Sequence, residues 1–314
     1  MKYTPYQWLT FFYLYSILGW MFESVYVSVR QKKLVNRGFL KGTFLPIYGS
    51  GAVMMLFVSE PFKENLILTY FAGVFGATLL ELITGVALEA IFKVRYWDYS
   101  YQKFNYKGYI CLSSSVAWGF FTIGMNEWLH PVIMNMLNKI PGPLTLLFVS
   151  FVTVVLCVDI VISVREALDL RDVLIRMEEM RKEMLLLRRR ADVIIACLDD
   201  SWHEFVEEHP GLERIEEVYK EIDLRIDKLK NLKNILISSE KLTEDQKKEF
   251  LDFKVMFHKV KEMQTNYQGH NLKVFGQRIS GNPTMISEKY RFSLEALKKR
   301  IWEEEPEKKP RQEH

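Results

Sequence analysis

Three glutamates, Glu23, Glu81 and Glu89, lie inside long apolar stretches, where an ionised side chain is unexpected. A carboxylate at the centre of a membrane-spanning helix costs about 2.5 to 3.5 kcal/mol on insertion scales, so such residues normally face a bundle interior or water. On a helix, Glu81 and Glu89 are about 80° apart and about 12 Å apart along the axis, so they can line one side of a groove. We predict that the three glutamates converge on one polar membrane site near Arg37, in the cytoplasmic half of the membrane.

The same carboxylates also have a structural interpretation. Arg37, Lys41 or Arg95 could neutralise each of them, or each could be protonated, and buried ion pairs of this kind can fix helix register. Asp159 lies near the end of its apolar stretch, where snorkelling to the interface or pairing with Arg165 accounts for it. Both interpretations of the glutamates stay open at this point.

A broken stretch next to Arg37 is the natural place for such a site. Residues 36–51 read Asn-Arg-Gly-Phe-Leu-Lys-Gly-Thr-Phe-Leu-Pro-Ile-Tyr-Gly-Ser-Gly, so glycines and a proline interrupt a sequence that is becoming apolar. Broken backbone at membrane depth needs protein or a wet cavity around it, and it often indicates a binding site. We therefore predict Asn36 and Tyr48 as contributors. The alternative is a sharp loop-to-helix entry with close helix packing.

A second loop, residues 97–112, is rich in aromatic rings and turn-forming residues. Loops with so many large rings are rarely solvated, so we expect this one to fold back against the helix ends. Asp98 and Asn105 are candidate contributors at the mouth of a cavity. For Asp98 the simpler interpretation is a turn that its carboxylate caps.

Five apolar stretches must position these residues, since a spanning helix needs roughly 20 apolar residues. They are about Tyr6–Val29, Gly42–Val58, Asn65–Phe92, Cys111–Trp128 and Pro143–Val164. The second is short, which fits its broken character. The predicted fold is all-α: a polytopic bundle of about five spans, with the second span broken, followed by a cytoplasmic helical or coiled-coil-like domain. The predicted domains are residues 1–165 in the membrane, 166–302 as the helical domain and 303–314 as a disordered tail.

The charges of the connections indicate an orientation. Basic residues crowd two connections, Arg30 to Lys41 and Lys93 to Lys107, whereas the opposite connections carry only Lys63 and Lys139. Short basic loops stay in the cytoplasm. The sequence therefore predicts a multi-pass protein of the cell (plasma) membrane, with its N-terminus outside and its C-terminus in the cytoplasm.

A series of short motifs recurs in order along the first half of the chain. They are Gly19-Trp20-x-x-Glu23, Asn36-Arg37-Gly38-Phe39-x-x-Gly42, Pro46-Ile47-Tyr48-Gly49-x-Gly51, Trp97-Asp98-Tyr99-Ser100, Phe104-Asn105-x-x-Gly108 and Trp118-Gly119. Together they resemble the bacterial family called putative ABC-transporter type IV, or CmpB-like, over roughly residues 8–165. The chain has Gly42-Thr43 where the family's proline-bearing turn would have Gly-Pro. The resemblance implies a small multi-pass domain, and it carries over no substrate or catalytic residue.

The second half of the chain is charged and helix-forming. A helix is expected to continue from the fifth span to about Glu208, with an apolar stripe that includes Leu168, Val173, Met177, Met180 and Met184. Further helices are expected at about Leu212–Ile237, from Lys241 to about Asn266, and at about Thr284–Ile301, with a loop at Tyr267–Pro283. Antiparallel packing of the first two helices is the natural use of their stripes, and homodimerisation is the alternative.

The motifs exclude several kinds of chemistry. The sequence contains no phosphate-binding Gly-x-x-x-x-Gly-Lys-Ser/Thr loop, no His-Glu-x-x-His pair and no Gly-x-Ser-x-Gly elbow. We therefore expect no catalytic residues, no cofactor and no metal, and no nucleic-acid partner. The leading hypothesis is a permease-like or ligand-binding membrane unit, whose helical domain couples it to a separate ATPase subunit or another protein. The competing hypothesis is a non-transporting membrane scaffold or sensor that acts through the helical tail.

Overall fold

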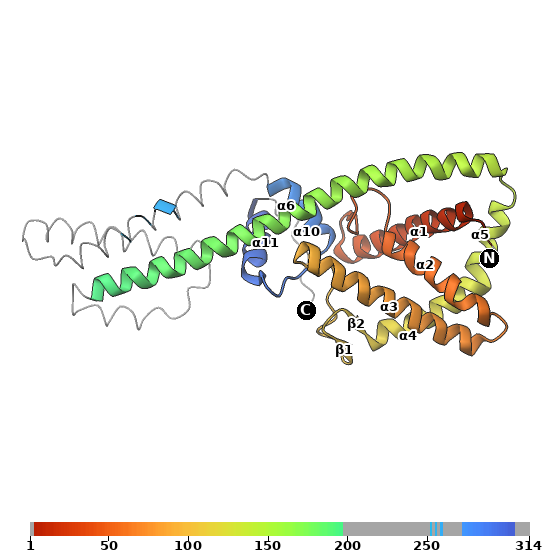
Figure 1. The fold of residues 1–314 in the computed structure, drawn as a ribbon, viewed down its shortest axis with the longest axis horizontal. Helices are drawn as coiled ribbons and strands as arrows, with labels where there is room; N and C mark the ends of the chain where they lie inside the picture. Colours follow the sequence, from red (N-terminus) through yellow and green to blue (C-terminus); the bar gives the residue numbers. More distant parts are fainter. Residues whose placement is uncertain (1–2, 197–251, 253–254, 256–257, 260–271, 305–314) are drawn as a thin grey trace, which may run out of the picture. The chain divides into compact units, whose positions relative to one another are not determined.

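The computed structural model describes residues 3–196, 252, 255, 258–259 and 272–304. This part of the chain is mostly helical, which confirms the all-α expectation (Figure 1). Contacts divide the chain into two compact units. The first unit comprises Met1–Arg171, Lys273–Lys289 and Ile301–His314, and the second comprises Asp172–Leu272 and Tyr290–Arg300.

The first unit is a helix bundle. Its helices are α1 (Pro5–Gln31), α2 (Pro46–Ser59), α3 (Leu66–Phe92), α4 (Leu112–Gly124), α5 (His130–Leu137), the first part of α6 (Gly142–Ala196) and α10 (Leu272–Gly281). Helix α1 packs on α2, α2 on α3 and α3 on α4 (Figure 1). A π-helical turn, Met125–Leu129, joins α4 directly to α5.

Helix ends in this unit follow from local chemistry. The Asn65 side chain accepts hydrogen bonds from the amides of Ile67 and Leu68 and so caps the start of α3. Lys32 and Lys93, which follow α1 and α3, adopt left-handed backbone with φ of 51° and 61°. This conformation turns the chain away from each helix axis. The loops that carry Arg37 and Arg95 therefore start at sharply defined points.

Two of the described helices are long and apolar enough to cross a membrane: α3, and the Gly142–Leu186 part of α6. The five-span count stays a prediction. Helix α2 has 14 residues and is about 21 Å long, which is less than a hydrocarbon core of about 30 Å. It begins at Pro46, because proline suits the first turn of a helix. The break predicted in the second span thus lies before the helix, in the loop that leads into it.

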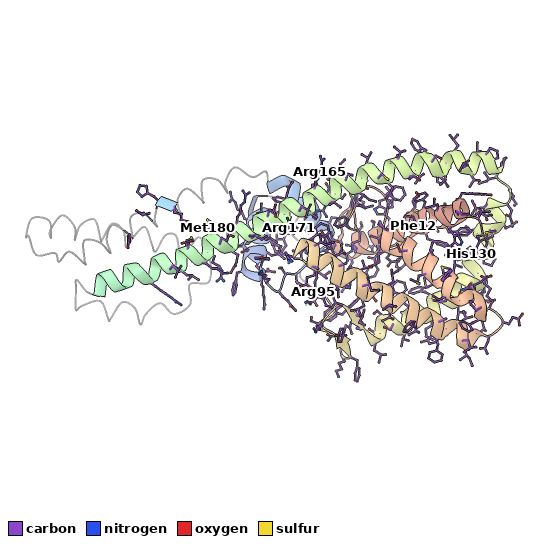
Figure 2. The ribbon with its side chains drawn as sticks, viewed as in Figure 1. Phe12, Arg95, His130, Arg165, Arg171 and Met180 are labelled. Carbon is purple, nitrogen blue, oxygen red and sulfur yellow. The ribbon has the colours of Figure 1, made fainter. Side chains whose placement is uncertain are left out.

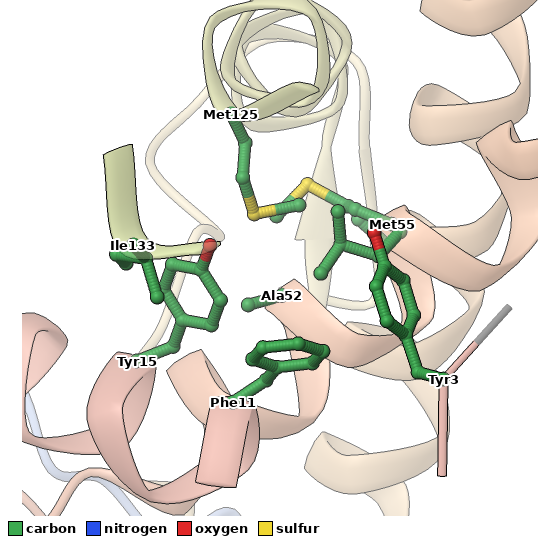
Figure 3. Packing of buried hydrophobic residues seen from close by; sticks show 9 residues of the cluster. Tyr3, Phe11, Tyr15, Ala52, Met55, Met125 and Ile133 are labelled. Carbon is green, nitrogen blue, oxygen red and sulfur yellow. The ribbon is translucent and has the colours of Figure 1, made fainter. Parts of the chain in front are cut away.

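Among the residues that the structure describes, two apolar clusters hold the bundle together. One joins α1, α2, α3, the π-helical turn and α5, and it contains Tyr3, Phe11, Tyr15, Ala52, Met55, Leu56, Ala77, Met125 and Ile133 (Figure 3). The other joins α1, the loop before α2, and α6, and it contains Tyr13, Leu40, Phe44, Val149, Val152 and Leu156. The second cluster fixes the loop of residues 36–45 against two helices, so this loop has a defined position.

Two segments contain elements that the sequence did not predict. Residues 97–112 fold back as expected, but they also form a small antiparallel hairpin of β1 (Asn105–Tyr106) and β2 (Ile110–Cys111). The predicted loop at Tyr267–Pro283 is wrong over Leu272–Gly281, because α10 occupies these residues. Phe275 and Ile279 are four residues apart and buried, and this apolar pair outweighs the glycines that suggested a loop.

The second unit contains the rest of α6 and most of α11 (Arg291–Glu304). Helix α6 continues without a break through the predicted domain boundary at residues 165 and 166. Four residues of the predicted stripe, Val173, Met177, Met180 and Met184, are buried. The helix expected at Leu212–Ile237 lies outside the described residues, as do residues 305–314 of the predicted tail. Of the helix expected from Lys241, the structure describes only residues 252, 255, 258 and 259, and all four are helical.

Candidate functional site

Glu81, on α3, is 6% exposed and accepts hydrogen bonds at both carboxylate oxygens. Oε1 accepts from the Tyr99 hydroxyl at 3.0 Å, and Oε2 accepts from the Trp118 indole at 3.1 Å and the Ser114 hydroxyl at 3.4 Å. Ser114 and Trp118 are four residues apart on α4 and therefore share one helix face. Tyr99 comes from the loop after α3. We refer to these four residues as the Glu81 cluster.

The Glu81 cluster supplies hydrogen-bond donors and no balancing positive charge. Among the described residues, no lysine or arginine pairs with Glu81, and the hydrogen-bond donors to its carboxylate are Trp118, Tyr99 and Ser114. Burial raises the pKa of the Tyr99 phenol, and the nearby Glu81 raises it further, so this hydroxyl stays protonated and able to donate. The arrangement can hold a carboxylate ready to accept a cationic group.

Glu23 lies beside this cluster. Its Oε1 accepts a 2.6 Å hydrogen bond from the Tyr48 hydroxyl, and its Oε2 is 3.6 Å from Arg37 Nε. The Tyr48 ring packs edge-on against the Trp118 ring, with centroids 6.3 Å apart. Gly19 makes this possible, because a Cβ there would overlap the Tyr48 side chain. The contact between the Tyr48 and Trp118 rings thus joins Glu23, Arg37 and Tyr48 to the Glu81 cluster.

Glu89 belongs to a separate group. Its Oε2 accepts hydrogen bonds of 2.5 Å from both Arg95 Nε and the Tyr109 hydroxyl. Arg95 is 4% exposed, lies over the Tyr109 ring at 4.5 Å, and also pairs with Glu288 at 2.6 Å. Burial disfavours its charge, but Glu89 and Glu288 outweigh burial and raise the pKa of Arg95. This is the paired arrangement that the structural interpretation of the glutamates predicted.

The ion pair of Arg95 and Glu89 lies at one end of the first unit. Arg95 follows the end of α3, at the opposite end of the unit from His130 (Figure 2). Arg95 Nη1 donates a hydrogen bond to the Lys107 carbonyl at 2.9 Å, so the guanidinium also binds the loop between β1 and β2. Glu89 and Arg95 therefore join α3 to the loop that delivers Tyr99 to Glu81.

Of the other predicted loop contributors, Asn36 binds α1 and its own loop, whereas Asp98 and Asn105 make local bonds. Asn36 accepts from the Trp20 indole at 2.6 Å and donates to the Lys41 carbonyl. Asp98 accepts from the Ser100 amide and hydroxyl, which is the turn-capping role expected on the simpler interpretation. Asn105 donates to the Gln102 carbonyl at 2.7 Å and accepts from the Gly108 amide at 3.0 Å.

Of the two roles expected for Asp159, the pairing with Arg165 is replaced by other contacts in the structure. Its carboxylate accepts the backbone amides of Lys41 and Gly42, at 3.1 and 2.9 Å, rather than pairing with Arg165. A carboxylate is a strong acceptor for two adjacent amides. Asp159 therefore fixes the loop before α2 to α6.

The sequence-based selection missed Tyr99, Ser114 and Trp118 as partners of Glu81. Tyr99 and Trp118 stand in two of the quoted motifs, Trp97-Asp98-Tyr99-Ser100 and Trp118-Gly119. These motifs, together with the four-residue spacing of Ser114 and Trp118, were the available signals. Arg278 and Asn282, which contact the loop of residues 36–41, carried no such signal, because more than 230 residues separate them from it.

The first unit is an apolar helix bundle, and two of the described helices are long and apolar enough to cross a membrane, as is typical of a helical membrane protein. The comparison with protein families agrees: the model of the family described as putative ABC-transporter type IV matches residues 10–164. This match confirms the resemblance inferred from the motifs. No curated protein and no solved structure matches the chain.

Proposed function

We propose that this protein is a permease-like or ligand-binding membrane unit whose binding site is the Glu81 cluster. The observation that carries the proposal is the state of Glu81. Its carboxylate is nine-tenths buried, three donors from two segments aim at it, and no cation among the described residues balances it. Such residues in membrane proteins usually mark substrate or ion pathways.

The missing positive charge indicates the ligand class. A buried carboxylate without a cation favours a small cationic ligand, because the ligand's charge would compensate the burial of the carboxylate. The Tyr99 hydroxyl and the Trp118 indole N–H already donate to this carboxylate, so it is oriented and keeps its acceptor character. We therefore propose a small monovalent cation, inorganic or ammonium-type, as the ligand.

The proposal includes the topology expected from the loop charges. The protein crosses the cell (plasma) membrane about five times, with its N-terminus outside and its helical part in the cytoplasm. If transport is driven by ATP, the ATPase is a separate chain that contacts the helical part. A homodimer formed through the helical part is the alternative partner. No catalytic role is assigned to the chain.

A membrane scaffold or sensor that acts through its helical part is the second candidate. Glu23 pairs with Arg37 and Glu89 pairs with Arg95, so two of the three membrane glutamates already have structural partners. This observation favours the second candidate for those two residues. Glu81, which has no such cationic partner among the described residues, is the residue whose substitution distinguishes the two functions.

The test uses the full chain, purified and placed in lipid nanodiscs. Thermal unfolding is measured in the chlorides of sodium, potassium, ammonium and tetramethylammonium, with N-methyl-D-glucamine chloride as reference at equal ionic strength. A ligand at about 100 times its Kd stabilises the folded state by about 2.7 kcal/mol, which is a shift of several degrees. We expect one cation to stabilise the wild type and Glu89→Gln, and to leave Glu81→Gln unchanged. If no cation shifts the wild type, or if Glu81→Gln shifts equally, the proposal is wrong.

A further inference from the structure

Residues 273–289, which we call the return segment, belong to the first unit, although the chain on both sides of them belongs to the second unit. The segment contains all of α10 except Leu272, and the turn and bridge residues that follow it. It is therefore covalently joined to the second unit at both of its ends. A rearrangement of the second unit must act on this segment through those two connections.

Arg278 attaches the return segment to the loop before α2. Its side chain is 7% exposed and donates to the Phe39 carbonyl at 3.1 Å, the Tyr96 hydroxyl at 3.1 Å and the Ser163 carbonyl at 2.8 Å. Its guanidinium also lies over the Phe39 ring at 5.0 Å. One buried side chain thus connects the return segment, the loop and α6.

Arg37 extends this attachment to the candidate site. Its Nη1 donates to the Gly281 carbonyl at 3.0 Å and to Asn282 Oδ1 at 3.3 Å, while its Nε faces Glu23 at 3.6 Å. Asn282 in turn donates to the Gly38 carbonyl at 3.1 Å. The guanidinium that balances Glu23 is therefore held in place by the return segment.

The other end of the return segment attaches to the end of α3, the helix that carries Glu81. Arg95 and Ile286 exchange backbone hydrogen bonds of 2.8 and 3.1 Å, as in a β-bridge. The Ser287 hydroxyl donates to the Lys93 carbonyl at 2.6 Å. The segment therefore contacts both loops from which the candidate site is built.

We propose that the return segment is a latch through which the second unit controls the site that contains Glu23 and Glu81. With the latch closed, Arg37 stays on Glu23, and the loops around residues 36–41 and 93–95 are fixed. When the second unit draws the segment away, Arg37 loses two acceptors, and the Glu23 side of the site opens. Individual hydrogen bonds contribute modestly to stability, so a set of this size can open without global unfolding. The control of ligand binding rests on the proposed function, whereas the opening of the latch does not.

The latch is tested by thiol labelling of the full chain in nanodiscs. Ser24 is 8% exposed and accepts the Arg37 amide, so Ser24→Cys reports whether this loop is closed. The reporter is placed in a chain whose Cys111, Cys157 and Cys197 are replaced by serine, and it is reacted with a membrane-impermeant maleimide. Asn282→Ala removes the two hydrogen bonds that join the segment to Arg37 and Gly38, and one to the Arg278 carbonyl within the segment. Loss of about two hydrogen bonds predicts a rise in labelling rate on the order of tenfold.

The matched control is Asn126→Ala, which removes two side-chain hydrogen bonds, to Ser59 and Thr122, in the π-helical turn. We expect it to lower the melting temperature and to leave the labelling rate unchanged. Ser287→Ala, which loosens the other end of the segment, is a milder second variant if Asn282→Ala does not fold, and it should raise labelling by a smaller factor. Equal labelling of wild type, Asn282→Ala and Ser287→Ala would overturn the latch.

A second readout separates the latch from the proposed ligand. The cation concentration that gives half of the thermal shift is measured for wild type and Asn282→Ala. A changed midpoint together with faster labelling supports control of binding by the latch. Faster labelling in a chain that no cation stabilises supports the latch and refutes the ligand. An unchanged midpoint with faster labelling overturns the control of binding.

Discussion

At the scale of single residues, the membrane glutamates differ in what balances their charge. Glu89 lies against Arg95, and Glu23 faces Arg37, whereas Glu81 is surrounded by neutral donors. Breaking a buried ion pair leaves an uncompensated charge and is strongly destabilising. Removing a lone buried charge has the opposite tendency, since the cost of burying it disappears. The same chemical change should therefore have different consequences at these positions.

Arg95→Ala tests the structural role of the Glu89 pair. The change removes the partner of Glu89 and Glu288 and the donor to the Lys107 carbonyl. We expect a loss of about 3 to 5 kcal/mol of stability, seen as a collapse of membrane abundance or of the melting temperature. Arg171→Ala, which removes a hydrogen bond to the Ile91 carbonyl at 3.4 Å near the end of the same helix, serves as the comparison. A melting temperature within about 2 °C of wild type for Arg95→Ala would contradict this role.

The sequence identifies which residues are unusual, and it says less about their partners. An ionisable residue in an apolar stretch is visible by composition, so Glu23, Glu81 and Glu89 could be selected at once. Their partners could not, because Tyr99, Trp118 and Arg95 approach them only after α3, α4 and the intervening loop have packed. Arg37 was selected correctly as a neighbour of Glu23, since both belong to adjacent motifs.

At the scale of elements, close helix packing builds the site. Helix α4 lies against α3, and Gly119 faces the ring of Tyr70, where a Cβ would overlap the ring atoms. Small residues that let helix backbones approach are typical of membrane helix interfaces. Trp118 is next to Gly119, so this approach also sets the distance between the Trp118 indole and Glu81.

Gly119→Ala should separate α3 from α4, and Tyr70→Ala should relieve the overlap. We expect Gly119→Ala alone to destabilise the protein by about 1 to 3 kcal/mol, as overpacking does. In the Tyr70→Ala background the same change should cost nothing, because the overlapping ring is absent. A double-mutant cycle on thermal unfolding measures this coupling. Additive effects of the two changes would show that the two residues do not set the packing.

Element boundaries were predictable where apolar length and caps agree, and less so elsewhere. The long α3 and the continuation of α6 past residue 165 follow from continuous apolar and periodic patterns. Helix α10 could not be predicted in this way, because Gly276 and Gly281 suggested a loop. In the folded chain, burial of Phe275 and Ile279 stabilises a helix there. Tertiary packing overrides local propensity in such segments.

At the scale of the whole molecule, the chain returns to its first unit after the second. The predicted segment 166–302 is divided between the two units, because residues 273–289 pack with the first. Sequence patterns could not indicate this, since Arg278 and Arg37 make their contacts across more than 230 residues of chain. The first unit therefore needs residues from near the end of the chain to complete its loops.

A chain that stops after Ala196 should lose stability in its first unit. The truncation removes the acceptors of Arg37 at Gly281 and Asn282, and the bridge between Arg95 and Ile286. We expect the melting temperature to fall by at least about 5 °C, since several hydrogen bonds of about 1 kcal/mol each are lost. A chain that stops after Glu304, and so keeps the return segment, is the control and should melt like the full chain. Equal melting of both truncated chains would show that the first unit is complete without the segment.

The most direct test of the central claim compares Glu81→Gln with Glu89→Gln in the full chain, by membrane abundance and thermal unfolding. If Glu81 is a binding residue, Glu81→Gln inserts normally and melts at or above the wild-type temperature, because a buried charge without a cation has been removed. Glu89→Gln, which weakens the pair with Arg95, should melt lower. A collapse of abundance or melting temperature for Glu81→Gln, equal to or larger than that for Glu89→Gln, would show that Glu81 is structural and would contradict the account.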